Sequence, residues 1–105
     1  MTAAPSYQLE NDAAGTLRLR GVISFVNAAQ AFASPPQAGQ RATALDVDLA
    51  ALESADSATL AVLIAWSAAA RKRGTALRYL RAPQGLRNLA KLADVEELLG
   101  FSQPS

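Results

Sequence analysis

The uncharged segment 57–70 (SATLAVLIAWSAAA) constrains the fold of this chain more than any other feature. It follows Asp56 directly and ends at the basic cluster Arg71–Arg73, before Gly74. Leu and Ala dominate the segment and neither Gly nor Pro interrupts it, so its composition favours a helix. Asp56 is suited to cap the first turn, basic side chains suit the negative end of the helix dipole, and Gly74 suits a left-handed turn after it. We therefore predict a helix over 57–70 with a defined start and end.

The predicted helix is apolar on two faces. At about 100° per residue, one face carries a stripe typical of packing on a core, formed by Leu60, Leu63, Ile64 and Ser67. The opposite face carries small residues around one large aromatic, namely Ala58, Val62, Ala65, Trp66 and Ala69. A helix that is apolar all round is either buried on both sides or reserved for a partner. In a chain of one-domain size we favour the partner, with Trp66 partly exposed as its anchor.

The composition excludes several classes of chemistry. With ten Lys and Arg against nine Asp and Glu, the net charge of +1 gives no global field that would attract nucleic acid. The chain has no cysteine and no histidine, so disulfides, thiolate nucleophiles, Ser-His dyads and ordinary zinc sites are absent. The glycines are isolated and form no phosphate-binding loop. We therefore expect a protein that is not an enzyme, with no catalytic residue, metal or cofactor.

No segment of the sequence predicts export or membrane insertion. The first ten residues, MTAAPSYQLE, lack the charged and apolar regions of a signal peptide. The uncharged segment 57–70 is shorter than the about 20 residues that span a bilayer. We expect the protein to be cytoplasmic.

Hydrophobic periodicity along the rest of the chain predicts an α/β fold. We expect strands at 6–10, 16–22, 42–49 and 76–81, and further helices over 24–34, from Pro83 to Ala93, and over 94–99. In the helix over 24–34, Phe25, Ala29 and Phe32 are expected to lie on one face. The segments predict a mixed central sheet of about four strands with helices packed mainly on one face, because strand–helix–strand units are right-handed. The chain is expected to be one domain over 1–105, with flexible tails at 1–5 and 101–105.

The junction between the third strand and the long helix resembles a known family. Its pattern is formed by Val47-Asp48-Leu49, Leu52, the run Ala55–Leu60 (ADSATL) and Leu63. This pattern is similar to that of STAS domains, which include anti-sigma-factor antagonists, sulfate-transporter tails and MlaB, the small subunit of the Mla phospholipid ABC transporter. Residues 86–99 (LRNLAKLADVEELL) are similar to the MlaB branch. The resemblance implies the STAS fold.

Two positions after Asp56 distinguish the branches of this family. Sporulation-type antagonists place a phosphorylatable Ser or Thr two residues after the Asp, where this chain has Ala58. MlaB-like subunits place Thr or Ser directly after the Asp, as Ser57 is here, in a loop implicated in contact with the ATPase subunit. Both branches commonly have Gly where this chain has Thr59. The resemblance therefore favours the MlaB branch.

The MlaB resemblance implies a non-enzymatic subunit that binds and stabilises or activates the cytoplasmic, MlaF-like ATPase of a phospholipid ABC transporter. Such a complex maintains outer-membrane lipid asymmetry, and the chain would be peripheral to the inner membrane through the complex alone, with no nucleic-acid partner. The expected partner-binding residues are Asp56, Ser57, Ala58, Thr59, Val62 and Trp66.

Two alternative functions remain open from the sequence. An anti-sigma-factor antagonist would be phosphorylated on Ser57 and would bind a kinase-type anti-sigma factor. A nucleic-acid binder would use the basic residues between Arg71 and Lys91, with strongly salt-dependent affinity. Asp56 needs no function beyond capping the helix, which by itself stabilises a protein by about 1 kcal/mol.

Overall fold

The structure, a computed structural model, describes residues 6–11, 16–34, 36, 44–95 and 99. Its elements are β1 (Tyr7–Asn11), β2 (Leu17–Gly21), α1 (Ala28–Ala33), β3 (Ala44–Asp48), α2 (Ser57–Lys72), β4 (Ala76–Leu80) and α3 (Gln84–Leu92). The expected tails 1–5 and 101–105 and most of the expected final helix over 94–99 lie outside the described residues.

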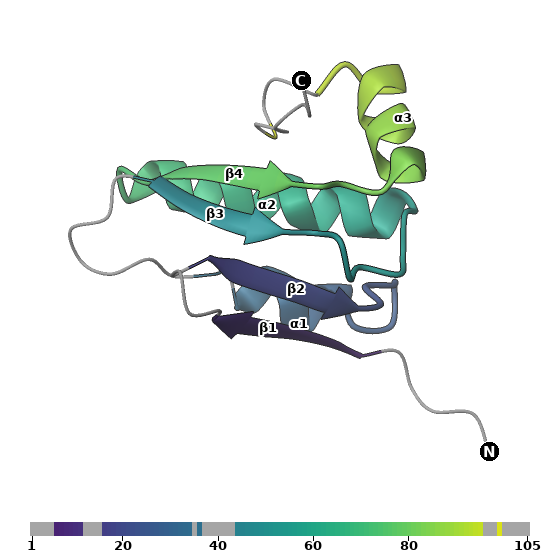
Figure 1. Cartoon of the computed structure of the whole chain (residues 1–105), viewed down its shortest axis with the longest axis horizontal. Helices are drawn as coiled ribbons and strands as arrows, with labels where there is room; N and C mark the ends of the chain where they lie inside the picture. The colour runs from purple at the N-terminus through teal and green to yellow at the C-terminus, as the bar shows by residue number, and fades with distance from the viewer. Residues whose placement is uncertain (1–5, 12–15, 35, 37–43, 96–98, 100–105) are drawn as a thin grey trace.

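The four strands form one mixed sheet in the order β1-β2-β3-β4. β1 and β2 pair antiparallel, whereas β3 pairs parallel with both β2 and β4. Figure 1 shows α1 and α2 on the same face of this sheet, with α3 beyond β4. Two successive crossovers that advance in one direction across a sheet place their helices on one face, because both are right-handed. The predicted α/β architecture is confirmed.

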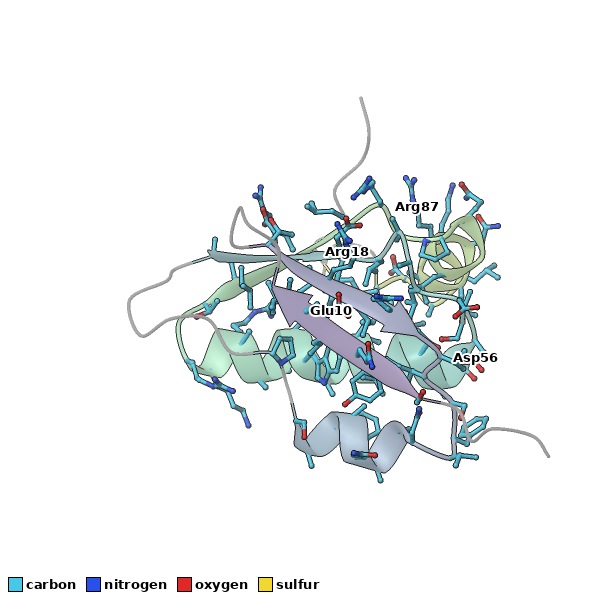
Figure 2. All side chains as sticks on the ribbon, turned by 60° about the horizontal axis from the view of Figure 1, so that its bottom comes forward. Glu10, Arg18, Asp56 and Arg87 are labelled. Atoms are coloured by element: carbon cyan, nitrogen blue, oxygen red, sulfur yellow. The ribbon has the colours of Figure 1, made fainter. Side chains whose placement is uncertain are left out.

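Alternation along the strands separates the core from the open face of the sheet. Leu17 and Leu19 are buried in β2, whereas Arg18 between them is exposed. Figure 2 shows Glu10 and Arg18 on adjacent strands of the sheet. On the open face, opposite charges on different strands form ion pairs, Arg20 with Glu10 at 3.2 Å and Arg78 with Asp46 at 2.8 Å. Only the face under the helices therefore contributes to the hydrophobic core.

Helix α2 begins and ends where the sequence predicts. The Asp56 carboxylate accepts a hydrogen bond from the Thr59 backbone N–H at 2.9 Å. After the helix, Gly74 has a φ of 79°, and the N–H groups of Gly74 and Thr75 donate to the carbonyls of Arg71 (3.0 Å) and Ala70 (2.9 Å). These two bonds form a Schellman motif, which satisfies carbonyls that the helix end would leave unpaired.

The first helix starts later than expected. α1 begins at Ala28, and its buried residues are Ala28 and Ala31. Phe25 precedes the helix and is 81% exposed, Ala29 is exposed, and Phe32 is 45% exposed. The prediction that a helix from Ser24 carries Phe25, Ala29 and Phe32 on one face is therefore wrong at Phe25, which precedes the helix. Hydrogen bonds from the Asn27 side chain to Val22 and Ser24 form a turn that delays the start of the helix.

The expected exposure of Trp66 is also wrong. Val62 and Trp66 are 0% exposed, and Ala58 is buried as well. The indole Nε1–H of Trp66 donates to the Ala31 carbonyl at 2.7 Å, and its ring lies 6.1 Å from that of Tyr7. α1 packs on this face of α2, and its alanines allow a close approach of the two helices. The two apolar faces of α2 are therefore both buried, one against α1 and β1 and the other against the rest of the core.

Candidate functional site at the start of α2

The connection from β3 to α2 is held by hydrogen bonds along its length. The Leu49 N–H donates to the Leu80 carbonyl at 2.8 Å, and the Ala50 N–H donates to the Asp48 carboxylate at 2.9 Å. Further along, the Glu53 N–H donates to the Gly21 carbonyl at 2.8 Å. The start of α2 is therefore placed against the carboxyl ends of β2, β3 and β4, where partners and ligands of α/β sheets commonly bind.

Asp48 anchors this connection as a charged side chain. It is buried, and the Arg81 guanidinium donates to both carboxylate oxygens. Burial by itself would raise the pKa of Asp48, but hydrogen bonds from Arg81 and Ala50, with the charges of Arg81 and Arg18, lower it below its usual value. Asp48 therefore has a structural role, because its ion pair with Arg81 holds the carboxyl ends of β3 and β4 together next to the site.

Asp56 caps α2 through the backbone N–H of Thr59. Its Oδ1 accepts from the Thr59 backbone N–H at 2.9 Å and lies 3.0 Å from the Thr59 hydroxyl oxygen. The capping role is confirmed, and the rest of the side chain is exposed. Figure 2 shows Asp56 at the end of the molecule where α2 begins. The residue is available to a partner while it fixes the first turn.

Thr59 is completely buried and links α2 to a distant loop. Its hydroxyl oxygen lies 2.8 Å from the Ser54 hydroxyl oxygen and 3.0 Å from the Ile23 carbonyl oxygen. The Ser54 hydroxyl accepts the Ile23 N–H at 3.0 Å. Both backbone groups of Ile23 are therefore bonded to hydroxyls from the start of α2 and the loop before it. Sequence analysis identified Thr59 as a departure from the usual Gly but gave no signal that Ile23 would be its partner.

The six predicted partner-binding residues divide into two groups. Asp56 and Ser57 are exposed, and Ser57 is the first residue of α2. The other four, Ala58, Thr59, Val62 and Trp66, are buried in the monomer. Only Asp56 and Ser57 lie on the surface. The candidate site is therefore confined to the N-terminus of α2 and does not extend along the helix. Ser57, the proposed phosphorylation residue, is accessible.

Two neighbouring features of this surface were not predicted. Phe25 and Val26 project from the turn that Thr59 and Ser54 hold, and they are 81% and 75% exposed. The start of α3 also lies alongside, since a Cβ placed on Gly85 would be 3.4 Å from the Cβ of Ala55. Both features come from segments distant in sequence, and the only sequence signal was the pair of consecutive large apolar residues after Ser24.

The described residues contain no group of three or more Asp, Glu, His or Cys side chains that could hold a metal ion. Asp46 and Asp48 are each paired with an arginine. Among the helices that the structure describes, none is long and apolar enough to cross a bilayer. The start of α2 presents the exposed side chains of Asp56 and Ser57, with the first turn held by the cap bond to Thr59.

Comparison with protein families identifies the family of this chain. The sequence model of the family described as "Mlab, STAS domain" matches residues 8–100. The chain therefore belongs to the MlaB-type STAS domain family.

Solved structures agree with the STAS fold. The crystal structure of an anti-sigma factor antagonist from Mycobacterium paratuberculosis superposes with a TM-score of 0.58 at 18% sequence identity, and the match covers 96% of this chain and 87% of that chain. At this identity the likeness concerns the fold. Comparison with curated proteins gave no match.

Proposed function

We propose that this STAS domain is a non-enzymatic subunit that binds the cytoplasmic ATPase of a phospholipid ABC transporter. The observation that carries the proposal is the exposed Ser57 directly after the capping Asp56, in a chain that belongs to the MlaB-type family. The position used for phosphorylation in sporulation-type antagonists is Ala58, which is buried and has no hydroxyl. The surface at the start of α2 is therefore better suited to permanent docking than to a phosphate switch at the usual position.

Docking would act by mass action. A subunit that binds only the folded, assembled ATPase raises the free energy of unfolding of that state. ATP would be bound and hydrolysed by the partner, since this chain has no phosphate-binding loop. In this role the protein supports the lipid asymmetry of the outer membrane from the cytoplasm, and it associates with the inner membrane through the transporter complex.

Co-purification with the ATPase tests the proposal. The MlaF-like ATPase encoded in the same genome is tagged and co-expressed with this chain, either unchanged or with Ser57→Arg. Ala68→Arg is the matched control, because Ala68 is exposed on the same helix three turns further on. We expect Ser57→Arg to abolish co-purification and Ala68→Arg to retain it, with both variants folded by circular dichroism. Failure of the unchanged chain to bind the ATPase would refute the proposal.

A second candidate function is that of an anti-sigma-factor antagonist. It is favoured by the fold likeness to the mycobacterial antagonist and by the accessible hydroxyl of Ser57. Incubation with a kinase-type anti-sigma factor and ATP, followed by mass spectrometry, separates the two functions. A phosphate mass shift that maps to Ser57 and is lost in Ser57→Ala would favour the antagonist over the transporter subunit.

A further inference from the structure

Phe25 and Val26 form an exposed apolar pair that the fold does not need. Their exposed fractions are 81% and 75%, and among the described residues the other exposed large hydrophobics are Phe32 and Leu92. Two consecutive large apolar side chains in water are unfavourable by themselves, whereas contiguous exposed apolar surface commonly marks an interaction site. The pair is therefore a candidate contact for a partner.

The turn that carries this pair is rigid. The Asn27 side-chain amide donates to the Val22 carbonyl at 2.9 Å and its oxygen accepts the Ser24 N–H at 2.8 Å, so one buried side chain fixes both ends of the turn. The Ser24 hydroxyl accepts the Val26 N–H at 3.2 Å. A turn fixed in this way loses little conformational entropy when a partner binds.

The turn is also fixed relative to the start of α2. Ile23 lies between Val22 and Ser24, and it donates its N–H to Ser54 and accepts from Thr59 at 3.0 Å each. We call these two hydroxyl contacts the Ser54–Thr59 clamp. Asp56 lies 3.0 Å from the same Thr59 hydroxyl. Through the clamp, Phe25 and Val26 are held in a constant position relative to Asp56 and Ser57.

The charge around this surface selects the chemistry of the partner. Glu53 and Asp56 are exposed there. Arg20 lines the same hollow as Glu53 and is paired with Glu10, so acidic side chains are in excess among these residues. Acidic side chains in excess repel the phosphates of nucleic acids and anionic lipid surfaces. They attract a protein surface that offers Lys or Arg, which steers association and fixes the orientation of the complex.

We propose that Phe25 and Val26, with Asp56 and Ser57, form one docking surface for a protein that presents an apolar pocket bordered by basic side chains, and that Thr59 is a positioning residue for it. The proposal rests on the proposed function for the identity of the partner, the ATPase subunit. It goes beyond that function by naming the apolar anchor, the charge of the opposing surface and the hydroxyl clamp that joins the two parts.

The apolar anchor is tested by binding of the purified ATPase subunit to Phe25→Ser. The matched control is Leu92→Ser, because Leu92 is equally exposed, at 86%, at the end of α3. We expect Phe25→Ser to weaken binding about tenfold or more, and Leu92→Ser to change it less than twofold. The affinity of the unchanged chain should fall as salt is raised, and Glu53→Gln should reduce this dependence. Equal effects of the two Ser variants, or affinity that rises with salt, would overturn the proposal.

The clamp is tested with Thr59→Val and Thr59→Ser. Thr59→Val removes the hydroxyl at nearly constant volume, whereas Thr59→Ser keeps it. We expect the first to weaken binding at least fivefold and to speed hydrogen exchange over residues 22–27, and the second to restore both. If Thr59 had only a structural role, Thr59→Val would weaken binding by the same factor in the Phe25→Ser variant as in the unchanged chain. If Thr59 positions Phe25, Thr59→Val should add little to the effect of Phe25→Ser, because the anchor is already lost.

The outcomes separate this inference from the proposed function. Binding of the ATPase to the unchanged chain, with no loss in Phe25→Ser, overturns the inference and leaves the proposed function intact. No binding of the ATPase to the unchanged chain overturns both. Loss of a homodimer in Phe25→Ser, measured by sedimentation, would assign the apolar pair to a second copy of this chain and would also overturn the inference.

Discussion

The burial of Trp66 makes the α2 face on which it lies part of the core. Its indole ring lies between α2 and Tyr7 of β1, and its N–H satisfies a carbonyl of α1. A residue that contacts both a strand and a helix contributes to stability through area, packing and one buried hydrogen bond. It is a central core residue and cannot act as a surface anchor.

Truncation of Trp66 should therefore affect stability before binding. We expect Trp66→Ala to lower the free energy of unfolding by about 3–5 kcal/mol, measured by urea denaturation. Trp66→Phe keeps most of the volume and loses the hydrogen bond to Ala31, so its loss should be smaller. If Trp66→Phe remains folded yet no longer binds the ATPase that the unchanged chain binds, the assignment of Trp66 to the core alone is wrong.

Asp48 gives the stability of the protein an acid-sensitive component. Its pKa is lower in the folded state than in the unfolded chain, so the unfolded state binds a proton more readily. The resulting stabilisation is fully present above the unfolded pKa, about 3.9, and is lost as pH falls through the folded pKa. We expect urea midpoints to fall below about pH 4 in the unchanged chain, and this fall to be smaller in Asp48→Asn. Parallel pH profiles for the two proteins would contradict the role of Asp48.

At the scale of elements, two glycines with positive φ among the described residues each end an element, but for different physical reasons. Gly74 ends α2 with a φ of 79°, and a Cβ there would meet nothing within 4 Å. Gly21 ends β2 with a φ of 95°, and a Cβ there would overlap the Ser6 carbonyl oxygen. The first glycine is required by conformation only, whereas the second is required by conformation and by space.

Replacing each glycine by alanine should separate these two requirements. We expect Gly74→Ala to lower the free energy of unfolding by about 1–2 kcal/mol, the cost of a left-handed residue with a Cβ. Gly21→Ala should cost about 3 kcal/mol or more, because the N-terminal part of β1 must also move. Thermal denaturation of the two variants measures the difference. Equal losses would show that the contact between Ser6 and Gly21 does not constrain β1.

At the scale of the whole molecule, acidic and basic side chains lie at opposite ends of α2. Glu53 and Asp56 lie at its start, whereas Arg71–Arg73 are exposed at its end. Arg78 and Arg81 pair with acids of β3, which offsets part of the positive charge between Arg71 and Lys91. This pairing does not favour the nucleic-acid alternative, and the end of the molecule with Glu53 and Asp56 offers acidic side chains to a protein partner.

Binding at that end should stabilise the partner. With this chain in hundredfold excess over its dissociation constant, the free energy of unfolding of the ATPase subunit should rise by about 2.7 kcal/mol. A thermal-shift measurement on the ATPase, with increasing amounts of this chain, follows the rise. Ser57→Arg at the same concentrations is the control and should give no shift. An equal shift with Ser57→Arg would place the contact elsewhere on the domain.

The sequence by itself determined the elements and their order. Alternation predicted the strands, as Leu17 and Leu19 around Arg18 show, and the caps Asp56 and Gly74 placed α2 within two residues of its observed bounds. These features depend on neighbours along the chain, where spacing and residue type are sufficient. The capping role of Asp56 was predicted in the same way, whereas the partner-binding role expected of Ser57 came from the family resemblance.

Only the tertiary structure decided which apolar residues are exposed. Periodicity shows that a face is apolar but not what covers it, so Trp66, expected to be partly exposed, is buried, and Phe25 is exposed. Trp66 is buried because α1 packs on α2, and Phe25 is exposed because Asn27 delays the start of α1. Both outcomes depend on contacts between segments far apart in the chain, whose geometry no local pattern encodes. The same reason hid the bond between Thr59 and Ile23, on which the shape of the docking surface depends.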